Sequence, residues 1–368
     1  MTDREPTEAP FSSNAIRLTG RQWLATGAIV LAVCLLVSPV WRLVEPFEPG
    51  ADYRIPYALN SDYWHFARYC RDAAGDDRIL VVGDSVIWGE YVRPQDTLSH
   101  HLNRLAGDER FANLGVNGTH PAALDGLVRY YARAAAGRRV LIHFNPLWMS
   151  SPRRDLQAQK ESQFNHPELV PQFMPRIPCY KAPFAERMGI AVERHLPFRA
   201  WINHMNVAYF DDMDLANWAI ENPYANPLSR ITCETPAPTE DARHENTPWN
   251  ERGIKATEFD WVAPVDSLQW RLFCDTLATL VARGCHVFVL VGPFNEHMLT
   301  PEGREAYEAI KSDIAARLSE NTSLYEVLPP LPSELYGDAS HPLPDGYAQM
   351  ASHLYAQDSF SRFAAGES

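Results

Sequence analysis

The chain contains a serine and a distant Asp-x-x-His pair that could together form a nucleophilic site. Ser85 stands in the segment Gly83-Asp84-Ser85, directly after an apolar run. Asp338 and His341 lie near the C-terminus, three positions apart. A serine hydroxyl becomes an effective nucleophile when an imidazole takes its proton, and a carboxylate beside that imidazole fixes its tautomer and stabilises its cation. These residue types, in the order Ser, Asp, His, indicate acyl transfer through a covalent intermediate.

Alternating apolar strands and helices predict the elements that would position these residues. We expect strands at 78–82, 110–114, 139–144, 285–291 and 323–328, and helices at 97–105, 122–136, 267–282, 301–319 and 344–355. Such alternation predicts a parallel sheet with right-handed crossovers. Ser85 then lies just past the carboxyl end of the first strand, where open α/β sheets bind ligands. His341 lies between the last strand and the last helix.

Three segments, in this order, resemble the blocks of the SGNH (GDSL-type) hydrolases. Val82–Gly89 resembles the nucleophile block, Asn113–Thr119 the second block, and Asp338–His341 the C-terminal Asp-x-x-His. The resemblance implies an α/β fold, a flavodoxin-like three-layer α/β/α sandwich with a parallel sheet. No cofactor is expected.

The same resemblance implies a role for each matching residue. Ser85 would be the nucleophile, His341 the base and Asp338 the residue that orients it. The backbone N–H groups of Ser85 and Gly118 would form the oxyanion hole. The family's third block departs here, because Asn145 has neither a glycine before it nor an acid after it. Its amide could still donate to the oxyanion.

Two further asparagines are expected to contact substrate. Asn117 lies beside Gly118 in the second block, and Asn295 follows the fourth predicted strand. Each candidate also has a structural alternative. Ser85 could cap a helix, Asp338 and His341 could cap the final helix, and Asn117-Gly118 could be an ordinary turn.

Residues 23–41 form an uncharged apolar segment with Trp23 and Trp41 at its ends. A helix of about 20 apolar residues spans a bilayer, and indole rings favour its interfaces. The pattern predicts an uncleaved anchor after a disordered tail (1–22) and before a Pro-spaced linker (42–50). A buried core helix and a cleavable signal peptide are the alternatives. The flanking arginines weakly favour an exported body, periplasmic or extracellular.

The body is expected to span 51–368, with an insertion at about 149–264 that interrupts the α/β alternation. This insertion is rich in proline, and pieces at 184–195 and 212–220 are expected to be helical. More than a hundred residues of this kind exceed an ordinary loop and indicate a subdomain or lid.

Charge and cysteine content exclude several function classes. The formal net charge of -13 argues against a nucleic-acid partner, which would require many Lys/Arg contacts to phosphates. The six cysteines show no zinc-binding spacing, so no metal site is expected. In an exported body, Cys179 and Cys233 are the pair that we expect to form a disulfide, whereas Cys274 and Cys285 are expected to pack as small apolar residues.

The anchor and the resemblance together imply a membrane-anchored serine esterase or O-acyltransferase. Its substrates would be O-acyl esters, chiefly acetyl esters, of cell-envelope carbohydrate, and a membrane-bound O-acyltransferase is a possible partner. Two alternatives stay open. A lipid-directed esterase would need an exposed apolar lid, which residues 201–219 could supply. A non-catalytic assembly partner would keep the fold without turnover, in line with the altered third block.

Overall fold

A five-stranded parallel sheet forms the centre of the computed structural model, which describes residues 18–234 and 247–367. The strands are β1 (Ile79–Gly83), β2 (Phe111–Gly115), β3 (Arg139–Phe144), β4 (His286–Val291) and β5 (Tyr325–Val327). Their order is β2-β1-β3-β4-β5, and all neighbours are parallel. This order confirms the predicted parallel α/β fold and is typical of doubly wound sheets, which bind ligands beside the first strand, where the strand order reverses.

Helices cover both faces of the sheet because its strands are apolar on both sides. Leu80 and Val82 of β1 belong to one core, and Ile79 and Val81 belong to the other. The first core is covered by α2 (Tyr63–Gly75), α5 (Pro121–Gly126), α9 (Leu268–Ala282) and α10 (Pro301–Ser319). The second is covered by α3 (Ser85–Trp88), α4 (Leu98–Ala106), α11 (Pro344–Ala356) and α12 (Asp358–Ala365). Strands that are buried on both faces have nearly continuous apolar sequences.

Several helices differ from the sequence-based expectations. Helices α2 and α12 were not predicted. For α2 a local signal was present, because Asp62 caps the helix by accepting a hydrogen bond from the His65 N–H. The helix expected at 122–136 is shorter. After α5 the chain continues as a π turn (Leu127–Tyr131) and then a 3-10 turn (Arg133–Ala135).

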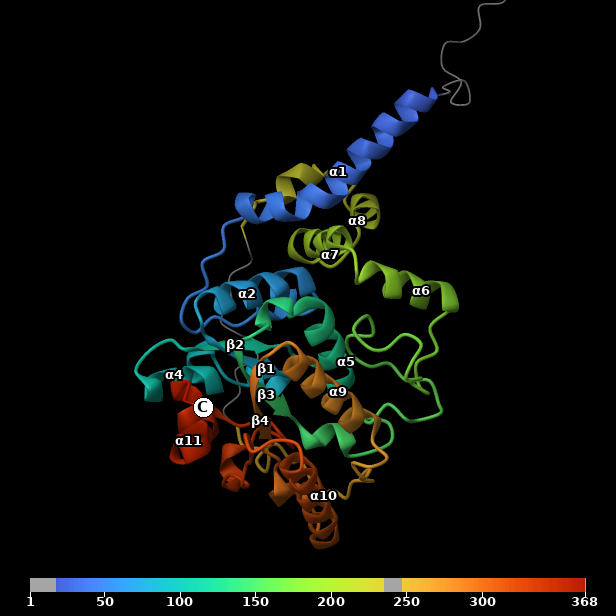
Figure 1. Cartoon of the computed structure of the whole chain (residues 1–368). Helices are drawn as coiled ribbons and strands as arrows, with labels where there is room; N and C mark the ends of the chain where they lie inside the picture. Colours follow the sequence, from blue (N-terminus) through green and yellow to red (C-terminus); the bar gives the residue numbers. More distant parts are fainter. Residues whose placement is uncertain (1–17, 235–246, 368) are drawn as a thin grey trace, which may run out of the picture.

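The apolar N-terminal segment forms α1 (Gly20–Val44), which projects from the body (Figure 1). This helix is long and apolar enough to cross a membrane, as an anchor or a signal sequence would be. It begins inside the expected tail and extends beyond the expected anchor. Residues 1–17 of that tail lie outside the described residues.

The C-terminal end of α1 is built into the body, and so is Glu45 in the expected Pro-spaced linker (42–50). Ser38 is buried, and its Oγ accepts a hydrogen bond from Trp64 Nε1 at 2.9 Å. Glu45, the residue after α1, is fully buried. Its carboxylate oxygens lie 2.8 Å from Arg68 Nη1 and 2.9 Å from His204 Nε2. The proline spacing suggested a stiff spacer, but these distant partners hold the segment in the fold.

The expected insertion contributes α6 (Phe184–Glu193), α7 (Pro197–Tyr209) and α8 (Leu215–Glu221). Helices α7 and α8 lie beside α1, and α6 lies farther from it (Figure 1). The small core of α7 and α8 is not the exposed apolar lid that residues 201–219 could supply under the lipid-directed alternative. It consists of Met205, Tyr209, Phe210 and Trp218, all buried, with Trp41 of α1 and Trp201 packed against them. These aromatic side chains therefore hold the end of α1.

The disulfide expected between Cys179 and Cys233 is not formed, and both thiols are free. Cys179 is buried, and its Sγ donates to the Leu156 carbonyl at 3.4 Å. Cys233 is half-buried, and its neighbour is Tyr209 beside α1. Cys285 is buried, as expected for a small apolar residue, whereas Cys274 is exposed.

Candidate active site

Ser85 is the first residue of the short helix α3, immediately after β1 and Asp84. The Asp84 side chain caps this turn by accepting a hydrogen bond from the Val86 N–H at 3.0 Å. The turn lies very close to the end of β2, where a Cβ on Gly115 would come within 2.2 Å of the Trp88 backbone nitrogen. The tight packing of β2 against α3 therefore requires glycine at position 115 and fixes the direction of Ser85.

Ser85, His341 and Asp338 form one hydrogen-bonded chain. Ser85 Oγ lies 2.7 Å from His341 Nε2. His341 Nδ1 lies 2.8 Å from both carboxylate oxygens of Asp338. The backbone N–H groups of Ser340 and His341 each donate to Asp338 Oδ1 at 3.0 Å. This arrangement places an imidazole where it could take the serine proton and a carboxylate where it fixes the imidazole tautomer.

Nearby carboxylates raise the pKa of His341. Burial alone would lower this pKa, but Asp338 outweighs the effect and, with smaller contributions from Asp84 and Glu90, raises it to about 9. Burial would raise the pKa of Asp338, yet His341 and the two backbone donors hold it well below its usual range. Tyr91 also donates its hydroxyl to Asp338 Oδ2 at 3.1 Å. The pair therefore favours an imidazolium next to a carboxylate.

Asp84 is the centre of a second buried network beside the serine. Its Oδ2 accepts hydrogen bonds from Asn145 Nδ2 at 2.9 Å and Trp148 Nε1 at 3.0 Å. Its Oδ1 lies 3.1 Å from His143 Nδ1. Burial opposes the charge on Asp84, but His143 and Asn145 outweigh it and lower the pKa to about 2. Asp84 is thus a charged carboxylate that fastens the end of β3 to the serine turn.

Asn145 lies next to the serine turn, but its amide donors are already used. One N–H donates to Asp84, and the same nitrogen lies 3.2 Å from Ser340 Oγ. Its Oδ1 accepts from the Leu147 N–H and caps the turn that follows β3. To donate to an oxyanion, this amide would have to give up its hydrogen bond to Ser340 Oγ. Sequence reasoning singled out Asn145 but could not identify these partners.

The two expected oxyanion donors are the backbone N–H groups of Ser85, after β1, and of Gly118, after β2. Gly118 has a left-handed backbone (φ 74°), and a Cβ there would lie 2.4 Å from Asn165 Nδ2. Within the described residues, neither the Ser85 N–H nor the Gly118 N–H donates to an acceptor. Both N–H groups are therefore left unused by the hydrogen bonds of the described part of the fold.

Asn117 and Asn295, the two expected substrate contacts, hold neighbouring loops. The Asn117 amide donates to Glu90, and its carbonyl accepts from Asn60 Nδ2 at 2.7 Å. Asn295 is fully buried, and its amide donates to the Asp338 carbonyl at 3.0 Å. Asn295 thereby supports the loop that carries Asp338. It has no exposed surface through which a substrate could reach it.

Sequence reasoning missed four residues that contact the central groups. Glu90 and Tyr91 follow the nucleophile block directly, so their closeness in sequence was the one available signal. His143 and Trp148 lie on either side of Asn145 in the sequence. Their contacts with Asp84 form because β3 packs beside β1.

The fold and this site define an α/β protein with a Ser-His-Asp arrangement at the carboxyl edge of a parallel sheet. No family model matches the chain, and no curated protein matches it. The function is therefore argued from the site itself.

Proposed function

We propose that this protein is a membrane-anchored serine esterase or O-acyltransferase of the SGNH type. One observation carries the proposal: Ser85 Oγ lies 2.7 Å from His341 Nε2, and His341 Nδ1 lies 2.8 Å from the Asp338 carboxylate. If Ser85 only capped one helix and Asp338 and His341 only capped another, no hydrogen bond between Ser85 and His341 would be required. Their contact favours a nucleophile with its base over the capping alternatives.

The proposed reaction has two halves. Ser85 Oγ forms a bond to the acyl carbon while its proton passes to His341 Nε2. The N–H groups of Ser85 and Gly118 stabilise the oxyanion. When the tetrahedral intermediate collapses, the ester bond breaks and the leaving alkoxide takes the proton from His341. Water or a sugar hydroxyl then attacks the acyl-enzyme with His341 again as base, which releases Ser85.

The packing of α1 supports an anchor that stays attached. A cleaved signal segment contributes nothing to the mature fold, whereas Ser38 and Glu45 make buried polar contacts with α2 and α7. Loss of Glu45 would leave Arg68 and His204 without this carboxylate. Breaking a buried charge pair in this way typically costs about 3–5 kcal/mol.

The substrate class rests on the anchor and on the resemblance. We propose O-acyl esters, chiefly acetyl esters, of cell-envelope carbohydrate, handled by an exported body beside a membrane-bound O-acyltransferase. The lipid-directed alternative loses its main support, because the apolar side chains of residues 201–219 that would have formed its lid are largely buried against α1.

A non-catalytic assembly partner is the second candidate, and one observation favours it. The Asn145 amide donates to Asp84 and Ser340, so a side-chain donor for the oxyanion is not free. In this case the Ser-His-Asp arrangement would be retained for its packing alone.

Ester hydrolysis by the full chain distinguishes the two candidates. The chain is purified in a neutral detergent with α1 intact, because a fragment from residue 51 would lack Glu45. We expect slow hydrolysis of a short-chain aryl ester and release of acetate from acetylated glycans. Ser85→Ala should abolish both, and an added sugar acceptor shows whether the acyl group is transferred. Equal inactivity of wild type and Ser85→Ala would favour the assembly partner.

A further inference from the structure

A positively lined cavity lies where α1 enters the body. Its volume is about 390 Å³, and it is bounded by the end of α1, by α2, by the turns after α5 and by the start of α7. The lining contains four arginines and one histidine, and it contains no aspartate or glutamate: Arg42, Arg71, Arg133, Arg194 and His195. In a chain with a formal net charge of -13, such a lining is a local exception.

Three arginines of this cavity, Arg42, Arg71 and Arg133, have no carboxylate in their own pocket, whereas Arg194 also faces Glu168 in the neighbouring pocket. None of the four arginines forms an ion pair within the described residues. Arg194 packs over the Tyr130 ring at 4.8 Å and donates to the Ile190 and Val170 carbonyls. Arg42 lies 5.9 Å from the centre of the Trp64 ring. Uncompensated guanidinium groups attract a phosphate strongly, since they can donate paired hydrogen bonds to its oxygens.

The cavity lies at the depth expected for lipid headgroups. Residues 20–36 of α1 are almost all exposed, and Ser38 is the first buried residue of the helix. At about 1.5 Å per residue this exposed stretch is roughly 25 Å long, close to the thickness of a hydrocarbon core. Ser38 and Arg42 line the cavity. A membrane around the exposed part of α1 would therefore place its headgroups at the cavity.

Apolar side chains continue from the cavity along α6. Leu196 lines the cavity and is 46% exposed. Leu196 itself follows the end of α6, and on the helix Val192 and Met188 lie four residues apart and are 52% and 41% exposed. Exposed apolar side chains at this spacing form one stripe on a helix, as in helices that lie in a membrane interface.

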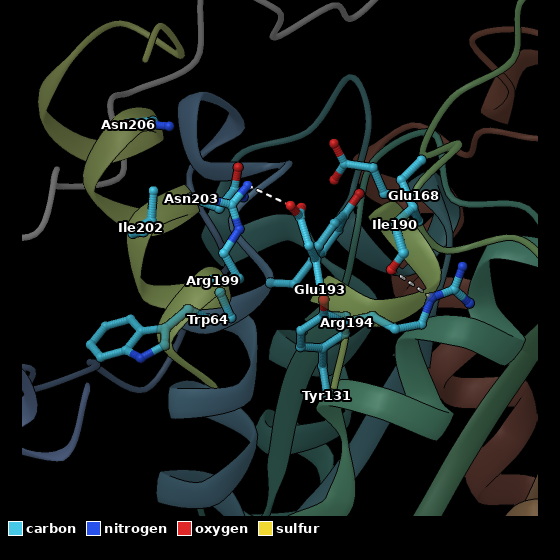
Figure 2. Close-up of a pocket in the computed structure, with 12 residues that line it drawn as sticks. Trp64, Tyr131, Glu168, Ile190, Glu193, Arg194, Arg199, Ile202, Asn203 and Asn206 are labelled. Carbon is cyan, nitrogen blue, oxygen red and sulfur yellow. Dashed lines mark hydrogen bonds and ion pairs between the residues drawn. The ribbon is translucent and has the colours of Figure 1, made fainter. Parts of the chain in front are cut away.

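A neighbouring pocket provides a contrast. It has a volume of about 180 Å³ and shares Arg194 with the first cavity. Figure 2 shows this pocket with Arg194 among its lining residues. Here Arg199 is paired with Glu193 at 2.7 Å, and Glu168 also contributes to the lining. The charges in this pocket are balanced, so it offers no comparable attraction for an anion. Arg199 is therefore a suitable control position.

We propose that the arginine-lined cavity binds the phosphate group of an anionic phospholipid in the leaflet next to the body. The lipid phosphate contacts the guanidinium groups, and its acyl chains lie along the apolar stripe of α6. This binding site is separate from the proposed ester chemistry, and it rests on the proposal that α1 remains in the membrane. A bound lipid would fix the height and tilt of the body above the bilayer.

Lipid binding by the full chain in maltoside detergent tests this proposal. Native mass spectrometry measures retention of dioctanoyl phosphatidylglycerol and, separately, of dioctanoyl phosphatidylcholine. We expect at least tenfold tighter binding of phosphatidylglycerol. The double substitution Arg71→Gln with Arg133→Gln should reduce this preference to within twofold. Both side chains are exposed, which limits the effect on folding. Arg199→Gln should keep the wild-type preference.

Three outcomes would overturn the proposal. One is equal affinity for the two lipids, and another is an unchanged preference in the double variant. The third is displacement of phosphatidylglycerol by an equal concentration of inorganic phosphate, which would assign the site to a soluble phosphate. The double variant should hydrolyse esters at the wild-type rate. Lipid binding and esterase activity can therefore fail independently.

Discussion

Ser85 Oγ and His341 Nε2 lie 2.7 Å apart although 256 positions separate them in the chain. Their meeting depends on α3, which carries Ser85, and on α11, which follows His341. The buried hydroxyl of Tyr347 in α11 donates to the Val86 carbonyl in α3 at 2.7 Å. The two helices are thus fastened together beside the candidate site.

Asp338→Asn tests whether the carboxylate fixes the His341 tautomer. The amide can donate to Nδ1 and so favour the wrong tautomer, as in the corresponding substitution of the serine protease triad, where turnover falls by about 10⁴-fold. We expect a loss of similar size in aryl ester hydrolysis. Tyr91→Phe is the control, since it removes one hydrogen bond to Asp338 and should cost less than tenfold. If Asp338→Asn keeps a tenth of the wild-type rate, Asp338 does not have this role.

The pH dependence of hydrolysis should reflect the raised pKa of His341. A general base must be neutral, so kcat/KM should rise with pH and level off above the pKa, which is about 9. Glu90 contributes to raising this pKa, so Glu90→Gln should move the midpoint to lower pH. Initial rates between pH 6 and 10, corrected for spontaneous hydrolysis, measure both curves. A midpoint that does not move in Glu90→Gln would contradict the assigned electrostatics.

The sequence predicted the sheet well because its strands are short apolar runs between turns, a local pattern. It predicted Ser85, Asp338 and His341 as a group because each lies at the end of an element. The partners of Glu45 could not be predicted in this way. Arg68, His204 and Tyr209 come from α2 and α7, and only tertiary packing brings their side chains to one carboxylate. The two acceptors of the Asn145 amide were equally inaccessible to local patterns.

Asp84→Asn should destabilise the fold through the network beside Ser85. The buried carboxylate faces His143, Asn145 and Trp148, and removal of its charge leaves these groups poorly compensated. We expect a loss of about 3 kcal/mol in the free energy of unfolding, measured by urea denaturation in detergent. Trp148→Phe removes one hydrogen bond to Asp84 and should cost less, about 2 kcal/mol. Equal stability of Asp84→Asn and wild type would argue against a structural role for this charge.

His204 should make the attachment of α1 depend on pH. Burial opposes its protonation, but Asp62 and Glu45 outweigh burial and raise its pKa from 6.5 to about 9. A raised pKa in the folded state contributes stability that is fully present below about pH 6.5 and is lost as pH rises through 9. The contribution is on the order of 3 kcal/mol.

Comparison of unfolding free energies at pH 6 and pH 10 measures this effect. The difference between wild type and His204→Gln should be larger at pH 6. His297→Gln is the control, because His297 is exposed and lies outside the network at the end of α1. Parallel pH curves for wild type and His204→Gln would contradict the proposed role of His204.

Covalent labelling of Ser85 by a fluorophosphonate tests the central claim most directly. The full chain is treated with the probe in detergent and digested, and the modified peptide is identified by mass spectrometry. We predict one adduct on Ser85, a rate of labelling that falls strongly in His341→Gln, and no adduct in Ser85→Ala. Absence of labelling on Ser85 in the folded wild type, or labelling at the same rate in His341→Gln, would contradict a nucleophilic serine activated by His341.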